Sequence, residues 1–243
     1  MKKNISGMTL VELLVGITLS LIILGATITI YLSTKQTNVV NEGSINIQND
    51  AQLALLVLKN DIQKTGWVND SNTEIFGLDN SITTASSDGG GTVADVIAVS
   101  FESCDSSIAR NDCRTDGTDA ADCNGVAVAG GARITNRYQI VNGSLVCNNV
   151  ALIDNVDNFQ VEYGFYNGVG VDYVPLSGVT DRSKIITVRF GLIISTENSL
   201  PDGRNQTLKL FDTDFDFTDK KLRRVFSATV PILNRQSTLL IGV

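Results

Sequence analysis

Histidine is absent from the 243 residues of this sequence. The commonest general base, the Ser-His and Cys-His nucleophile pairs and most zinc and iron sites are therefore excluded. The glycine-rich stretch at 87–92 is not followed by Gly-Lys-Ser/Thr, which excludes a P-loop as well. We expect a protein that is not an enzyme and that uses no cofactor and no metal ion.

Basic residues are also scarce, with 19 Lys and Arg against 26 Asp and Glu. Because an acidic chain repels phosphate backbones, no direct binding of nucleic acid is predicted. The one basic cluster contains Arg223 and Arg224, shortly after two lysines. We interpret it as a solvated strand end or an internal ion pair.

Cysteine occurs four times, and never as CxxC, so a zinc site is disfavoured. In a domain outside the cytoplasm, the even number indicates two disulfides. Three pairings are possible, and the spacings do not choose among them. The simplest one joins neighbours, Cys104 with Cys113 and Cys123 with Cys147.

One long apolar segment lies near the N-terminus. Residues 13–32 carry no charge and, at about 1.5 Å per residue, span the hydrocarbon core of a bilayer. Lys2 and Lys3 precede it, which predicts a cytoplasmic N-terminus and an outward-facing remainder. Glu12 stands at its beginning, and since a carboxylate in lipid costs roughly 2.5–3.5 kcal/mol on insertion scales, a functional partner is expected.

Three kinds of segment fit this pattern: a secretory signal peptide, a plain anchor and a prepilin-type leader. The apolar run is longer than a usual signal-peptide core and has no clean small-x-small site at its end. KKNISGMTLVELLVGITLSLIILG, residues 2–25, resembles the N-terminus of type IV prepilins and pseudopilins. The family pattern is a basic leader ending in glycine (Gly7), an aromatic residue or methionine (Met8), Thr-Leu, and then glutamate (Glu12). Met8 stands where phenylalanine is commoner.

This resemblance implies processing and assembly. A prepilin peptidase would cut between Gly7 and Met8 and methylate the Met8 amine. Glu12 would pair with the N-terminal amine of a neighbouring subunit during docking. Because Met8 and Glu12 are four residues apart, the sequence equally allows a pair within one chain.

Beyond the membrane segment, helical spacing returns at Ala51, Leu55, Leu58 and Ile62. Residues 8 to about 64 are therefore predicted to form one helix, which ends near Gly66 and Trp67. The remainder favours strands, including a hairpin with an Asn-Gly turn. The expected strands are 93–101, 133–147 (the hairpin), 157–166, 184–194, 207–215 and 223–234.

The expected fold class is α+β, a long N-terminal helix packed on an antiparallel β-sheet domain, as in pilins. Its parts would be a leader (1–7), a transmembrane half-helix (8–32), an amphipathic half-helix (33–66) and an extracytoplasmic globular domain (67–243).

Three later stretches resemble PilW-type minor pilins, relatives of the J-type pseudopilin of type II secretion. They are QNDAQLALLVLKNDIQKTGW (48–67), the region 121–164 and RRVFSATVPILNR (223–235). The second stretch favours pairing Cys123 with Cys147.

An aspartate cluster, FDTDFDFTD, begins like a calcium loop. Phe217 occupies the required glycine position and Arg223 that of the closing glutamate, so the match fails. We interpret Asp212, Asp214 and Asp216 as the solvent face of a strand. Asp219 lies just beyond it.

The resemblance implies a minor pilin at or near the tip of a bacterial type IV pilus that primes pilus assembly and supports twitching motility, adhesion or DNA uptake. Its partners would be the prepilin peptidase, other minor pilins, the major pilin and the inner-membrane assembly platform. It would be a single-pass inner-membrane protein before assembly and part of the fimbrium at the cell surface afterwards. The alternatives are a minor pseudopilin of type II secretion and a membrane-anchored extracytoplasmic binding protein.

Overall fold

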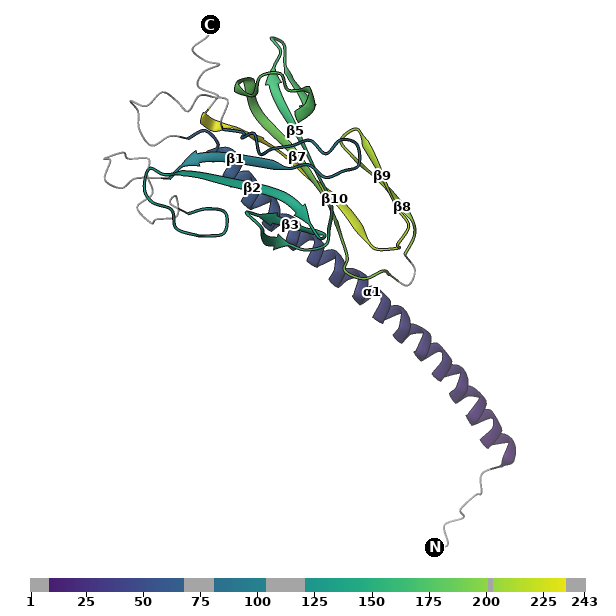
Figure 1. Ribbon diagram of the computed structural model, residues 1–243. Helices are drawn as coiled ribbons and strands as arrows, with labels where there is room; N and C mark the ends of the chain where they lie inside the picture. The colour runs from purple at the N-terminus through teal and green to yellow at the C-terminus, as the bar shows by residue number, and fades with distance from the viewer. Residues whose placement is uncertain (1–8, 68–80, 104–120, 201–202, 235–243) are drawn as a thin grey trace. The chain divides into compact units, whose positions relative to one another are not determined.

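The computed structural model describes residues 9–67, 81–103, 121–200 and 203–234. The chain divides into two compact units, 1–44 and 45–243. One helix, α1 (Leu10–Lys64), contributes its first part to one unit and its last turns to the other. The predicted long helix is therefore present (Figure 1).

The two ends of α1 follow from local sequence. Oγ1 of Thr9 accepts a hydrogen bond from the backbone N–H of Glu12 at 3.3 Å, so Thr9 caps the first turn. At the other end Gly66 has φ of +77°, a conformation that glycine adopts without steric cost. The Gly66 N–H then donates to the carbonyl of Ser100 at 2.9 Å, which joins the helix end to the sheet.

In the first unit every residue from Leu10 to Leu32 is exposed. Among the described residues, α1 is the one helix that is long and apolar enough to cross a bilayer. Within the described ranges nothing covers this apolar surface, and a surface of this length is typical of helices that lie in lipid or against other helices.

The second unit contains two four-stranded antiparallel sheets and a separate hairpin. The first sheet has the order β1-β2-β3-β4 and comprises β1 (Ile97–Glu102), β2 (Arg133–Val141), β3 (Ser144–Cys147) and β4 (Val150–Ile153). The second has the order β10-β7-β5-β6 and comprises β10 (Arg223–Pro231), β7 (Ile185–Ser195), β5 (Val156–Tyr166) and β6 (Val171–Pro175). The hairpin pairs β8 (Gln206–Leu210) with β9 (Thr213–Phe217), and two 3₁₀ turns, η3 (Leu176–Gly178) and η4 (Arg182–Lys184), precede β7.

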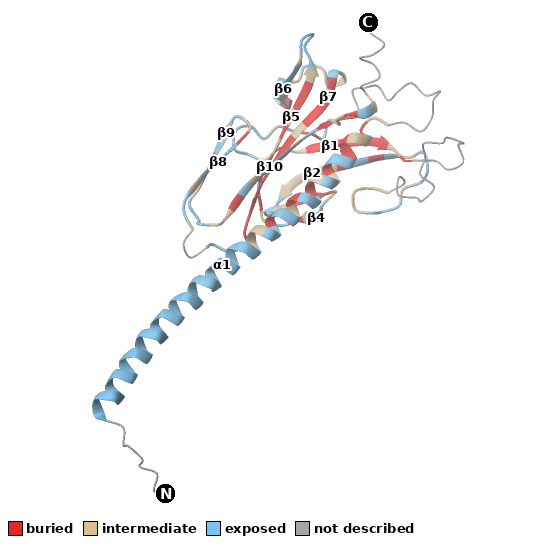
Figure 2. Ribbon diagram, turned by 180° about the vertical axis from the view of Figure 1, so that it is seen from behind, coloured by how far each residue is buried: buried red, intermediate tan, exposed pale blue. Residues whose placement is uncertain are grey.

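The main core lies between the last turns of α1 and the two sheets. The buried helix face and the inner strand faces form one apolar cluster (Figure 2). From α1 it takes Ile47, Ala51, Ala54, Leu58 and Ile62. Thus the spacing seen in the sequence does mark the buried face, although Leu55 is only partly buried.

A smaller cluster lies on the opposite face of β7, where the β8–β9 hairpin packs. Ile193, which alternates with the main-core residues Leu192 and Ile194, contacts Leu210 and Phe215 there. Gly191 leaves the space that Leu210 fills, because a Cβ at Gly191 would lie 2.3 Å from Leu210 Cδ1.

The strand prediction was right in outline and wrong in three places. The Asn142-Gly143 turn joins β2 to β3, with φ of +51° and +78°, as predicted. By contrast, 207–215 is not one strand, because the chain reverses between β8 and β9, where Phe211 has φ of +54°. Strands β4 and β6 were not predicted at all; both are short pieces of four and five residues.

Candidate functional site

The N-terminal motif is described from Thr9 onward, so the predicted cleavage and methylation sites, Gly7 and Met8, lie outside the described residues. Glu12 stands in the first turn of α1 and is exposed. Thr9 and Glu12 have the spacing of a helix-capping box. A carboxylate in this turn also interacts favourably with the positive end of the helix dipole. No ion pair of Glu12 is recorded within the described part of the chain.

A shallow apolar groove runs along α1 just after Glu12. Its lining residues are Leu13, Gly16, Ile17, Ser20, Leu21 and Leu24. A Cβ at Gly16 would meet no atom within 4 Å, and the Ser20 hydroxyl is already satisfied by the Gly16 carbonyl at 2.7 Å. Small residues four apart on an apolar helix allow a second helix to approach closely.

In the second unit, Cys123 and Cys147 form a disulfide that joins a loop to the end of β3. This is the pairing that the resemblance to PilW-type proteins favoured. The other predicted pair, Cys104 with Cys113, lies outside the described residues.

Beside the disulfide, α1 carries a buried acid. Asp61 is 7% exposed, and its Oδ2 accepts hydrogen bonds from the hydroxyl of Tyr138 and, at 2.6 Å, from the amide nitrogen of Asn136. Burial raises the pKa of the Asp61 carboxyl, and the two hydrogen bonds oppose this effect. Both donors come from β2, two residues apart, and therefore from one face of the strand.

Asn136 connects this acid to the disulfide. Its Oδ1 accepts from the backbone N–H of Cys123 and from the amide of Asn148, each at 3.2 Å. On the other side of the bridge, the Asn124 amide donates to the Cys147 carbonyl at 3.2 Å. One polar network thus runs from α1 through β2 to the disulfide-linked loop.

Two family models match the chain. Residues 2–28 match the prokaryotic N-terminal methylation motif, and residues 129–234 match Type IV Pilus-assembly protein W. Over these two ranges the chain is similar to type IV prepilins and to PilW-type minor pilins. Pilin-type proteins are in general structural rather than enzymatic.

Two further comparisons add little. A solved structure of a type IV-like pilin from Thermus thermophilus is 14% identical, with a TM-score of 0.47, and the match covers 77% of this chain and 96% of that one. A comparison with curated proteins finds no match.

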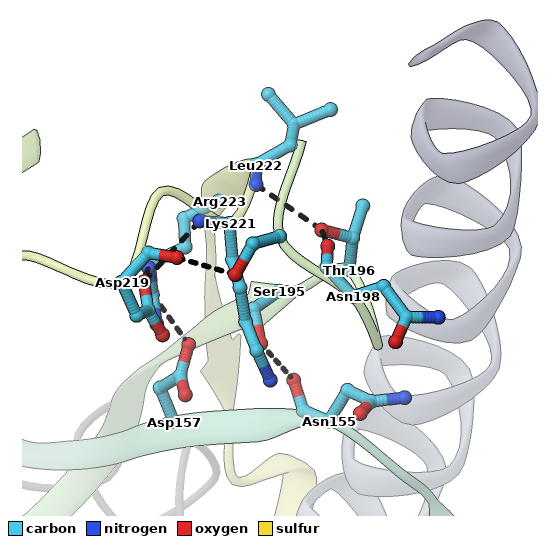
Figure 3. A network of polar contacts seen from close by, with 10 residues as sticks. Asn155, Asp157, Ser195, Thr196, Asn198, Asp219, Lys221, Leu222 and Arg223 are labelled. Carbon is cyan, nitrogen blue, oxygen red and sulfur yellow. Dashed lines mark hydrogen bonds and ion pairs between the residues drawn. The ribbon is translucent and has the colours of Figure 1, made fainter. Parts of the chain in front are cut away.

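Within the basic cluster of this prepilin-like chain, Arg223 forms ion pairs with acidic residues of the same domain. Arg223 pairs with Asp157 at 2.7 Å and with Asp219 at 2.5 and 2.6 Å (Figure 3). Its guanidinium carbon also lies 3.9 Å from the centroid of the Phe217 ring. The hydrogen bonds from Arg223 lower the pKa of the Asp219 carboxyl. The interpretation as an internal ion pair is therefore confirmed for Arg223.

The side chains of the aspartate cluster do not come together to form one binding site. Asp214 and Asp216 face solvent from β9, as predicted, but Asp212 lies in the turn before that strand. Asp216 accepts a hydrogen bond from the Thr207 hydroxyl at 2.6 Å, and Asp219 is paired with Arg223. Across the described ranges, no group of three or more His, Cys, Asp or Glu side chains is placed to hold a metal ion.

Asp61 and its two hydrogen-bond donors on β2, Asn136 and Tyr138, were not predicted from the sequence. A signal was present for one of them, because Asp61 interrupts the apolar face of α1 between Leu58 and Ile62. An acid on the apolar face of a helix either marks a point where that face meets water or has a hydrogen-bond or ionic partner in the core, because an unpaired buried charge is costly. Nothing in the sequence indicated that Asn136, 75 residues away, would supply the donor.

Proposed function

We propose that this protein is a minor pilin of a type IV pilus, inserted through α1 at or near the fibre tip, where it primes pilus assembly. One observation carries the proposal: an exposed apolar half-helix that begins with a lone carboxylate, Glu12, inside a matched methylation motif. Twitching motility, adhesion or DNA uptake would then depend on this protein through the fibre.

The proposed processing explains why a carboxylate, Glu12, is kept at the start of the membrane-spanning segment. Cleavage after Gly7 leaves a methylated amine on Met8, four residues from the acid. In lipid a lone carboxylate is costly, whereas one beside an ammonium is compensated by charge and by hydrogen bonding. Docking against the new N-terminus of a neighbouring subunit supplies that ammonium, so the cost of Glu12 in lipid favours assembly.

The proposed parts act in sequence. The leader (1–7) is removed, residues 8–32 hold the chain in the inner membrane, and residues 33–66 carry the helix outward to the extracytoplasmic domain (67–243). The partners would be the prepilin peptidase, the assembly platform, other minor pilins and the major pilin. The exposed groove beginning at Leu13 supports helix–helix packing at this stage.

A charge-removing substitution tests the proposal. Glu12→Gln keeps the side-chain size and removes the charge, and Glu42→Gln makes the same change at another exposed position of α1. We expect Glu12→Gln to be processed and membrane-bound but depleted from sheared pili, while Glu42→Gln enters them like the wild type. Equal incorporation of both variants would contradict the proposal. A wild-type protein that stays in the cell envelope and is required for type II secretion would also contradict the proposal.

A further inference from the structure

We propose that the Cys123–Cys147 disulfide is a redox latch that holds the last turns of α1 on the sheet through Asn136 and Asp61. The bridge closes a loop onto the end of β3, and Asn136 touches both the loop and the helix. All residues of the latch lie within the second unit, so this proposal does not depend on the role of the assembled fibre.

The amide of Asn136 has a fixed orientation. Asn136 is fully buried, and an amide oxygen has two lone pairs. Cys123 N–H and the Asn148 amide occupy that oxygen, so the Asn136 NH₂ group points to Asp61. Loss of the Cys123 donor leaves a buried acceptor half satisfied and frees the amide to turn.

The loop depends on the bridge for its position. The hydrogen bonds recorded for residues 121–127 are mostly within the loop, centred on Asp122. Two of them leave it, from Cys123 N–H to Asn136 and from Asn124 to the Cys147 carbonyl, and they flank the disulfide. Without the covalent link, the loop gains conformational freedom and both contacts weaken together.

The effect reaches α1 because of Asp61. Among the buried α1 residues in the described part of the chain, Asp61 is the one ionisable side chain. With Asn136 turned away, Tyr138 is the remaining donor to its carboxylate, and an under-satisfied buried carboxylate favours opening to water. The helix turns around Leu58 and Ile62 would open with it.

The redox step needs an external partner. A dithiol reductant opens the latch: the S–S bond breaks, each sulfur gains one electron and one proton, and the dithiol becomes a disulfide. A disulfide oxidant outside the cytoplasm closes the latch by the reverse exchange. The helix would therefore dock firmly only after the domain reaches an oxidising compartment.

Hydrogen exchange on the full chain in detergent micelles tests the latch. The oxidised wild type is compared with a Cys123→Ala/Cys147→Ala double variant, which removes this bridge without a reductant and leaves Cys104 and Cys113 in place. We expect exchange in residues 55–64 to rise about tenfold in the double variant, as for a lost buried hydrogen bond. We expect β5 and β7 to change much less.

Two point variants separate the latch from general destabilisation. Asn136→Ala should raise exchange in α1 while the disulfide is intact, and adding the double cysteine change should then raise it little further. Asn124→Ala, which removes only the bond to the Cys147 carbonyl, should leave α1 close to the wild type. The single tryptophan, Trp67, lies just after α1 and gives a second readout through its emission.

Two results would overturn the latch. One is a double variant whose α1 exchanges like the oxidised wild type. The other is an equal rise in α1, β5 and β7, which would make the bridge a general stabiliser. If Asn136→Ala does not fold, the double cysteine variant still decides between these outcomes.

Discussion

Asn136 donates a hydrogen bond from Nδ2 to Oδ2 of Asp61 at 2.6 Å, which joins β2 to α1 across 75 residues of sequence. Tyr138 donates to the same oxygen from the same face of β2. The helix is therefore positioned on the sheet by a polar contact of defined geometry as well as by apolar burial, and this contact leads to the first two predictions.

The Tyr138 hydroxyl should contribute measurably to stability. Tyr138→Phe removes one of the two donors to a buried carboxylate, and we expect the free energy of unfolding to fall by about 1–3 kcal/mol. Denaturant titration of the purified chain measures this. Tyr166→Phe is the matched control, because its hydroxyl bonds to the Gly168 carbonyl at an exposed turn and its loss should cost about 0.5 kcal/mol or less. Equal costs would contradict the role of Tyr138.

The raised pKa of Asp61 predicts a pH dependence of known sign. Protonation is easier in the folded chain, so the carboxyl stabilises the fold at pH values below its ordinary pKa of 3.8. This contribution is lost as the pH rises through the higher folded value. Relative to Asp61→Asn, the wild type should therefore lose stability as the pH rises above about 4. Melting temperatures of both chains across this range provide the measurement, and a difference that stays constant or grows with pH would contradict it.

A different site tests the packing of the β8–β9 hairpin. Gly191→Ala places a methyl group against Leu210, which is 2% exposed and cannot turn into solvent, so we expect a loss of about 1–3 kcal/mol. Gly170→Ala has open space around it and should be nearly neutral. In a Leu210→Ala background, the cost of Gly191→Ala should shrink, and unfolding titrations of the four chains test this. An unchanged cost would mean that Leu210 is not the obstacle.

The sequence predicted what depends on local pattern. The helical spacing around Leu58 identified the buried face of α1, and the Asn142-Gly143 turn located a hairpin, because each signal lies within a few residues. The turn at Phe211 carries no glycine or asparagine and so gave no such signal. The pairing of Asp61 with Asn136 depends on which strand the helix crosses, and periodicity does not specify that.

The central claim is that the chain is processed as a prepilin, and the most direct test is its N-terminus. Intact mass and N-terminal sequence would be measured on native protein from membranes of cells with and without the prepilin peptidase. We predict a chain that begins at methylated Met8, and only when the peptidase is present. A chain that still begins at residue 1, or one cut beyond residue 32, would contradict it.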